Sequence, residues 1–305
     1  MFKTYFLAAL SIISALYIVA WLLIGRDRRR RERLAGGTPE APSPTLLQSF
    51  IGFVANFLDT LGIGSFATTT SMFKLWRLVP DEQVPGTLNV GHALPTITET
   101  FIYIAIVQVS VPTLLIMIAA AVLGAWIGAG IVAHWPRRTI QISMGLALFA
   151  VAGLMVLRRL NIIEALGSGS SLGLDGYLLW VGAFGNFALG ALMTIGIGLY
   201  APCMALVYML GMQPLAAYPI MMGSCAFLMP VGSVQFIRNN RYSLRAALGL
   251  TLGGIPGVLL AAFLVKSLPL DYVIWLVVIV VVYTATRMLH SARSERIARL
   301  GAAKP

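Results

Sequence analysis

One short sequence occurs twice inside long apolar segments, as TLGIG at residues 60–64 and TIGIG at residues 194–198. The two copies lie at equivalent places in two halves of the chain. In a membrane, a Gly-x-Gly break within a hydrophobic helix frees backbone groups that lipid cannot satisfy, so the break must face protein or water. Paired breaks in the two halves of a duplicated membrane protein indicate a transporter's substrate site.

The composition is that of a polytopic membrane protein. Of 305 residues, 58% are hydrophobic and 11% are charged, and the mean hydropathy is +0.86. The net charge of +11 comes from basic residues between apolar segments, which positive-inside topology explains better than nucleic-acid binding. The two cysteines and three histidines show no spacing typical of a disulfide framework, metal site or catalytic triad, so no metal or cofactor is expected.

The N-terminal segment is predicted to be an uncleaved membrane anchor. An apolar run from about Tyr5 to Ile24 is long enough to cross a bilayer, and an arginine-rich block follows it from Arg26 to Arg33. The positive-inside rule places this block in the cytoplasm and the N-terminus outside. The anchor is assigned to residues 1–35, and a linker rich in Gly, Pro and Ala to residues 36–45.

The rest of the chain divides into two repeats separated by a polar loop. A shift of 134 residues superposes the two copies of the opening motif and places Pro80 on Pro214, and a nearby shift matches Gly124 with Gly257. Chance coincidence of common membrane residues is the alternative, but the agreement of segment lengths favours duplication. The predicted parts are repeat 1 at 46–160, the loop at 161–175, repeat 2 at 176–290 and a cytoplasmic basic tail at 291–305.

Each repeat is predicted to hold one interrupted segment followed by three ordinary spans. The interrupted segments, 46–79 and 177–210, are too long for one crossing of about 20 residues and too short for two. A re-entrant hairpin of two half-helices fits this length, and the Lys and Arg distribution favours it over a full crossing. The predicted fold is an all-α integral membrane protein with an anchor helix and two inverted repeats. The ordinary spans are expected at 84–107, 113–134, 139–157, 214–237, 244–265 and 272–289.

Three stretches carry a family resemblance: FLDTLGIG at 57–64, LMTIGIG at 192–198 and PGTLNVGH at 85–92. They resemble the TauE/SafE sulfite exporter family over about 46–289, which leaves the arginine-rich anchor as an addition. Members of that family usually carry a longer glycine run after Gly-Ile-Gly, where this chain has Ser65 and Leu199. The resemblance implies membrane transport of a small sulfur-containing or organic anion, such as sulfite or an organosulfonate.

The segment after each break is expected to bind this anion. A half-helix that begins near the middle of the bilayer presents unpaired N–H groups and the positive end of its dipole to an oxyanion. For the hydroxyl residues, the alternative is a hydrogen bond to their own helix. Neither a P-loop nor a dinucleotide-binding motif is present, so ATP-driven transport is not expected. The residues expected at the substrate site are Gly62, Gly64, Ser65, Thr68, Thr69, Asn89, Gly196, Gly198, Tyr200 and Ser224.

Three ionisable residues lie at the expected membrane depth. Asp59 precedes the first break, and His92 and Glu99 are seven residues apart on one face of a helix. They are candidates for proton coupling, because ionisable groups within a membrane usually face a partner or a water-filled cavity. Alternatively, Asp59 caps the half-helix at the break, and His92 and Glu99 hydrogen-bond to a neighbouring span.

The sequence as a whole predicts a secondary transporter in the inner (plasma) membrane that moves a small anion by alternating access. The N-terminus is expected outside and the C-terminus in the cytoplasm. A passive anion channel is the alternative, and a membrane-embedded enzyme is a weaker one. The expected partners are the anion and the lipid bilayer, with no nucleic acid, and homo-oligomerisation is left open.

Overall fold

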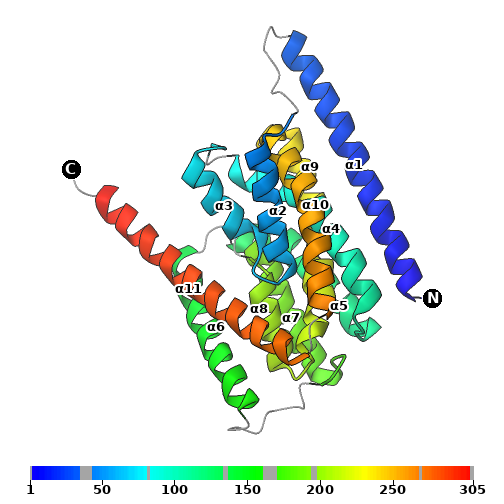
Figure 1. The fold of residues 1–305 in the computed structure, drawn as a ribbon, viewed down its shortest axis with the longest axis vertical. Coiled ribbons are helices and arrows are strands. Elements are labelled where there is room, and N and C mark those ends of the chain that lie inside the picture. Colours follow the sequence, from blue (N-terminus) through cyan, green and yellow to red (C-terminus); the bar gives the residue numbers. More distant parts are fainter. Residues whose placement is uncertain are drawn as a thin grey trace. The chain divides into compact units, whose positions relative to one another are not determined.

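The computed structural model describes residues 2–34, 43–80, 83–132, 137–160, 170–193, 198–267 and 270–302. Within these ranges the chain is helical, apart from loops and one isolated β-bridge between Ser171 and Met212 (Figure 1). The helices are α1 (Phe2–Leu34), α2 (Leu46–Thr60), α3 (Ser65–Trp76), α4 (Val84–Ile106), α5 (Val111–Val132), α6 (Arg137–Arg159), α7 (Gly176–Met193), α8 (Tyr200–Met209), the short 3-10 helix η1 (Pro214–Ala216), α9 (Ala217–Arg238), α10 (Leu244–Ser267) and α11 (Leu270–Ala302).

The all-α fold class predicted from the sequence is confirmed in the described residues. Most helix ends lie within about three residues of the predicted spans, because apolar length and Gly or Pro positions are local properties of the chain. The exceptions are α1 and α11, which continue as helix through their basic segments to Leu34 and Ala302. Four described segments are long and apolar enough to cross a membrane: Lys3–Asp27, Gly176–Met193, Pro214–Arg238 and Leu244–Leu264.

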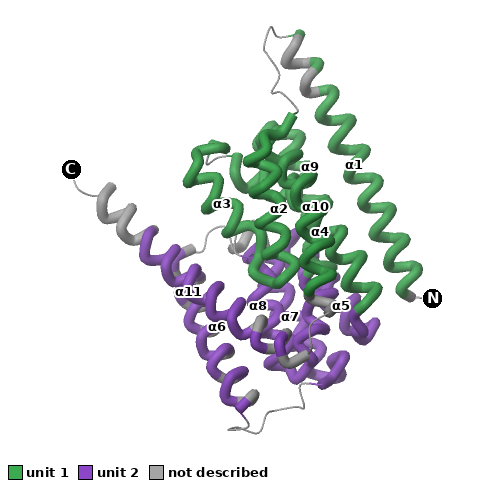
Figure 2. Tube along the Cα trace, in the orientation of Figure 1, with its two compact units in different colours: residues 1–106, 222–267 green, residues 107–221, 268–305 purple. Residues whose placement is uncertain are grey.

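The helices form two compact units that do not follow the order of the chain (Figure 2). Unit 1 consists of residues 1–106 and 222–267, and unit 2 consists of residues 107–221 and 268–305. Each unit therefore takes helices from both predicted repeats. The repeat boundaries themselves stay a prediction.

In unit 1, α1 is packed against the body and not only tethered to it. The hydroxyl of Tyr17 donates to the carbonyl of Val90 in α4 at 2.9 Å. One turn later, the indole N–H of Trp21 donates to the hydroxyl of Tyr242 at 3.2 Å. The opposite face of α1 is apolar and exposed, as expected of a surface that faces lipid. Its exposed side chains include Ile12, Leu16, Val19, Leu22 and Leu23.

The chain reverses direction between α2 and α3 (Figure 1). A single apolar cluster brings together Ile51 early in α2, Phe73 late in α3, Val79 just after α3, Val84 at the start of α4 and Leu250 of α10. The beginning of α2 and the end of α3 therefore lie at the same end of unit 1. Since the 15 residues of α2 extend about 22 Å, the reversal lies deep within the unit.

Helices α2 and α10 approach each other to backbone contact. A Cβ atom at Gly253 would overlap the carbonyl oxygen of Ser49, and one at Gly257 would overlap that of Phe53. Only glycine allows the two backbones to come this close. Small residues are the usual means by which helices pack tightly in membranes, where no hydrophobic driving force acts between them.

In unit 2, α5 and α7 pack in the same manner. A Cβ atom at Gly124 would overlap the carbonyl oxygen of Phe187, and one at Gly190 would overlap that of Ala121. Helices α6 and α11 form a second close pair in this unit. Among the described residues, each unit thus contains a helix crossing at which glycine allows backbone contact.

Candidate functional site

The junction between α2 and α3 is shaped by two glycines in the left-handed region. Gly62 has φ of +95° and Gly64 has φ of +90°, conformations that other residues adopt only with strain. The N–H of Gly62 donates to the carbonyl of Asp59 at 2.7 Å, and the N–H of Ile63 donates to the carbonyl of Leu58 at 3.0 Å. These bonds satisfy carbonyls left over at the end of α2, and the glycines then turn the chain into α3.

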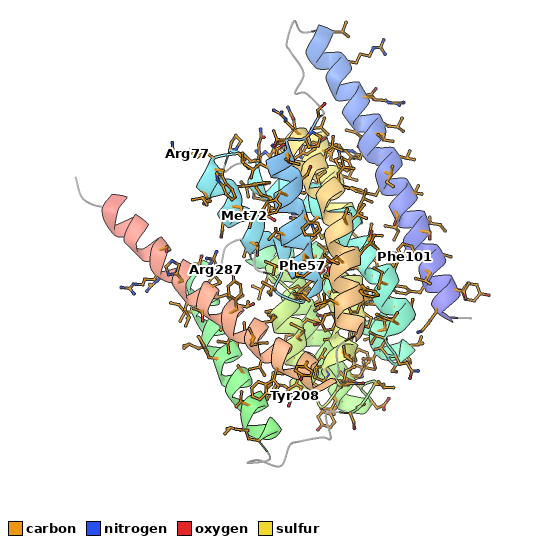
Figure 3. The ribbon with its side chains drawn as sticks, in the orientation of Figure 1. Phe57, Met72, Arg77, Phe101, Tyr208 and Arg287 are labelled. Carbon is orange, nitrogen blue, oxygen red and sulfur yellow. The ribbon has the colours of Figure 1, made fainter. Side chains whose placement is uncertain are left out.

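A carboxylate joins the two half-helices across this junction. Asp59, which is 2% exposed, accepts a hydrogen bond from the backbone N–H of Ser65 at 2.6 Å. This contact places a negative group at the positive end of the α3 dipole. Figure 3 labels Phe57 near this junction and Arg77 at the opposite end of α3. Asp59 therefore has the capping role that the sequence left open.

His92 of α4 contacts both helices of the α2–α3 hairpin. Its Nδ1 lies 3.0 Å from Oδ1 of Asn56 in α2, and its Nε2 lies 2.9 Å from Oγ1 of Thr69 in α3. The amide nitrogen of Asn56 donates to the carbonyl of Gly52 at 2.8 Å, so the atom facing His92 is an acceptor. His92 must then donate through Nδ1 and, when neutral, accept through Nε2 from Thr69. Both half-helices are thereby bound to one imidazole.

Glu99 lies two turns further along α4, at the end of α2. Its Oε1 is 2.8 Å from Oγ1 of Thr60, and the same Thr60 oxygen is 2.8 Å from the carbonyl of Asn56. The hydroxyl of Tyr103 donates to the carbonyl of Thr60 at 3.2 Å. Glu99, Thr60 and Tyr103 are all buried. Together with Asp59, Asn56, Ser65, Thr69 and His92, they form what we call the junction network.

Other residues predicted for the substrate site pair with their own helix. Oγ1 of Thr68 donates to the carbonyl of Gly64 at 3.3 Å, and the amide of Asn89 donates to the carbonyl of Pro85 at 2.9 Å. These bonds are the local alternative that polar side chains in membrane helices commonly adopt. Neither of these two hydrogen bonds reaches a residue of the junction network.

The residues predicted in the second half are divided between the two units. Gly196 lies outside the described residues, as does most of the second copy of the motif. Gly198 is exposed and Tyr200 is buried at the start of α8, both in unit 2. Ser224 is buried in α9 and belongs to unit 1.

The sequence analysis did not predict that the side chains of three residues would take part in the junction network: Asn56, Thr60 and Tyr103. Asn56, Asp59 and Thr60 follow the spacing i, i+3, i+4, which puts them on one face of α2. This polar face in an otherwise apolar segment could have identified Asn56 and Thr60 from the sequence. No sequence pattern could have identified Tyr103, because its hydroxyl bonds to a backbone carbonyl.

Among the described residues, no group of three His, Cys, Asp or Glu is placed to hold a metal ion. Cys203 and Cys225 are both buried and are not joined to each other. The contacts of the junction network described above are hydrogen bonds between its side chains and with the backbone.

A comparison with protein-family models matches residues 1–155 to "Sulfite exporter TauE/SafE". The match begins at the first residue, so it includes α1, which the resemblance in sequence had left outside the family. This correction agrees with the packing of Tyr17 and Trp21 against the body of unit 1. No curated protein and no solved structure matches the chain. With half of its length matched and its fold formed by apolar helices, the chain belongs to the TauE/SafE sulfite exporter family and is a multi-pass membrane protein.

Proposed function

We propose that the protein is a secondary transporter that carries a small anion, sulfite or an organosulfonate, across the inner (plasma) membrane. The observation that carries this proposal is the carboxylate of Asp59 bound to the N-terminal N–H of α3. A carboxylate is an oxyanion, so a position that accepts it deep inside unit 1 also suits a substrate oxyanion. During transport the substrate would take the N–H of Ser65 from Asp59. Membership of a sulfite exporter family supports sulfur oxyanions as the substrate class.

The α2–α3 hairpin is proposed to enter the membrane from the cytoplasm and return to it. Arg77 ends α3 at the same end of unit 1 as the start of α2. Arg245 lies at that end too, where its Nε donates to the carbonyl of Ser43 at 2.8 Å. Lys3 marks the other end of α1, with its Nζ donating to the carbonyl of Ala105 at 3.3 Å. The positive-inside rule then favours a cytoplasmic arginine end and an external N-terminus.

This topology predicts which positions a membrane-impermeant maleimide reaches in intact cells. In a background with Cys203 and Cys225 replaced by alanine, Lys3→Cys is expected to be labelled from outside. Arg77→Cys is expected to react only after permeabilisation, which also serves as the control that the thiol is reactive. Labelling of positions 3 and 77 together in intact cells would contradict the hairpin, because with the N-terminus outside only a full crossing brings position 77 outside.

Two inverted repeats and alternating access are proposed on the pattern of glycine contacts. In the proposed repeats, α7 corresponds to α2, with residue numbers 134 higher, and α10 corresponds to α5, with residue numbers 133 higher. Equivalent positions make equivalent contacts in the two units, and chance similarity in sequence alone gives no reason for that. This correspondence supports duplication and, with an odd number of crossings per repeat, inversion. The contact of Phe53 with Gly257 in unit 1 is equivalent to that of Phe187 with Gly124 in unit 2. The contact of Asn56 with Gly254 is likewise equivalent to that of Gly190 with Ala121.

Counterflow in proteoliposomes tests the proposed function. Purified protein in liposomes loaded with unlabelled sulfite is expected to take up external radiolabelled sulfite saturably and faster than liposomes loaded with chloride. Protein-free liposomes provide the background. A flux that rises linearly with concentration and shows no acceleration by internal sulfite would identify a passive channel and overturn the carrier.

A further inference from the structure

We propose that Glu99 carries the proton that is exchanged during transport, and that Thr60 links this proton to the helix junction. This inference rests on the proposed function and deepens it, because it assigns the coupling ion and the group that holds it.

Thr60 lies between two oxygen atoms but has one hydrogen to donate. Its Oγ1 is 2.8 Å from the backbone carbonyl of Asn56 and 2.8 Å from Oε1 of Glu99. A carbonyl can only accept, so if Thr60 donates to Asn56, the carboxyl of Glu99 must supply the other hydrogen. If both contacts are ordinary two-centre hydrogen bonds, Glu99 is a carboxylic acid. Complete burial of Glu99 favours the same neutral form, since an ionised carboxylate within a membrane is costly.

The other two ionisable groups of the junction network have different tasks. Asp59 accepts a hydrogen bond from the N-terminus of α3 at 2.6 Å, where the helix dipole stabilises a carboxylate against the cost of its burial. His92 uses one ring nitrogen to donate to Asn56 and the other to accept from Thr69, as neutral imidazole does. Of the three, Glu99 is the group whose contacts require a proton that it can lose.

Asp59 and Tyr103 are the titratable neighbours of Thr60, whereas Lys74 and Arg245 lie elsewhere in unit 1. Lys74 is in the last turn of α3 and Arg245 at the start of α10, both at the opposite end of unit 1. Tyr17 of α1 donates to the carbonyl of Val90, and Lys3 to that of Ala105. Tyr103 lies one turn from Glu99 on α4 itself and donates to the carbonyl of Thr60. Asp59 precedes Thr60 on α2.

Loss of the proton from Glu99 would reverse the hydrogen bond at Thr60. Thr60 would then donate to the carboxylate and release the carbonyl of Asn56. This change falls in the last turn of α2, directly before Gly62 and the reversal into α3. The protonation state of Glu99 is thereby connected to the position of Asp59 and to the N-terminus of α3 that is proposed to receive the anion.

The test compares anion exchange with proton-driven accumulation in proteoliposomes that contain a lumenal pH dye. Radiolabelled thiosulfate is the probe, since it does not itself titrate near neutral pH. Glu99→Gln is the main variant, because its amide can donate to Thr60 permanently as the acid does. We expect the ratio of pH-gradient-driven accumulation to counterflow, and the coupled change in lumenal pH, to fall at least about tenfold relative to wild type.

Thr60→Val and Thr60→Ser provide a second, independent pair. The valine variant is expected to lower the ratio of gradient-driven accumulation to counterflow, and the serine variant to restore that ratio. Absence of counterflow in the wild type, with sulfite as well as thiosulfate, would overturn the proposed function. Normal wild-type counterflow combined with undiminished gradient-driven accumulation in Glu99→Gln would overturn only the assignment of Glu99. Counterflow lost together with coupling in a folded Glu99→Gln would also overturn it.

Discussion

Replacing Gly253 by alanine is expected to force α2 and α10 apart and to lower the Tm of the protein by about 2–12 °C. The added methyl group would overlap the carbonyl oxygen of Ser49, which belongs to the backbone and cannot turn away as a side chain can. Overpacking of this kind costs about 1–3 kcal/mol, and each kcal/mol shifts Tm by about 2–4 °C in domains of 150–250 residues. The measurement is the temperature at which the monodisperse peak of detergent-solubilised protein disappears.

Gly25→Ala is the matched control. It adds the same methyl group to a helix where nothing lies within 4 Å, so Tm should stay the same or rise. Gly124→Ala extends the prediction to unit 2, because its methyl group would overlap the carbonyl of Phe187. Equal Tm values for Gly253→Ala, Gly25→Ala and wild type would show that the α2–α10 crossing is looser than described.

Replacing Asp59 by alanine is expected to lower sulfite counterflow at least about tenfold and to destabilise the α2–α3 hairpin. The bond to the N–H of Ser65 joins the two half-helices, and a hydrogen bond to a charged group contributes about 1.5–3 kcal/mol. Since 1.4 kcal/mol corresponds to about tenfold in population, much of the protein would leave the geometry that presents α3 to the anion. The measurements are Tm and the initial counterflow rate per folded molecule.

Asp59→Asn keeps the side-chain oxygen that caps α3 but removes the negative charge. The amide oxygen still accepts from Ser65, so the stability should remain near that of wild type. Because a neutral acceptor competes with the substrate by about 1 kcal/mol less than a carboxylate, the half-saturating sulfite concentration should fall about fivefold. An unchanged half-saturating concentration would contradict competition between Asp59 and the anion, and a wild-type rate and Tm in Asp59→Ala would contradict the capping role.

Much of the helical organisation was predictable because it depends on local properties of the chain. The length of apolar runs predicted helices such as α4 and α5 to within about three residues at each end. Gly62 and Gly64 marked the end of α2, since both adopt positive φ. The continuation of α1 through its arginines was not anticipated, because charge alone does not end a helix.

The candidate site was predictable only in part. Asp59, His92 and Glu99 were identified because ionisable residues stand out in an apolar segment. Which partner each one would take was not, and two readings stayed open for all three. Thr68 and Asn89 show why, since the same polar residue types instead bond to their own helix.

The sequence by itself determined that this protein is an all-helical membrane protein with an interruption after Thr60, because hydropathy, segment length and glycine act within a few turns of one helix. Only the tertiary structure decided that α2 packs against α10, more than 180 residues away, and that α4 brings His92 and Glu99 to the α2–α3 hairpin. Such pairings depend on contacts between distant segments, and glycine spacing and polar side chains acquire their roles only when the backbones that carry them meet.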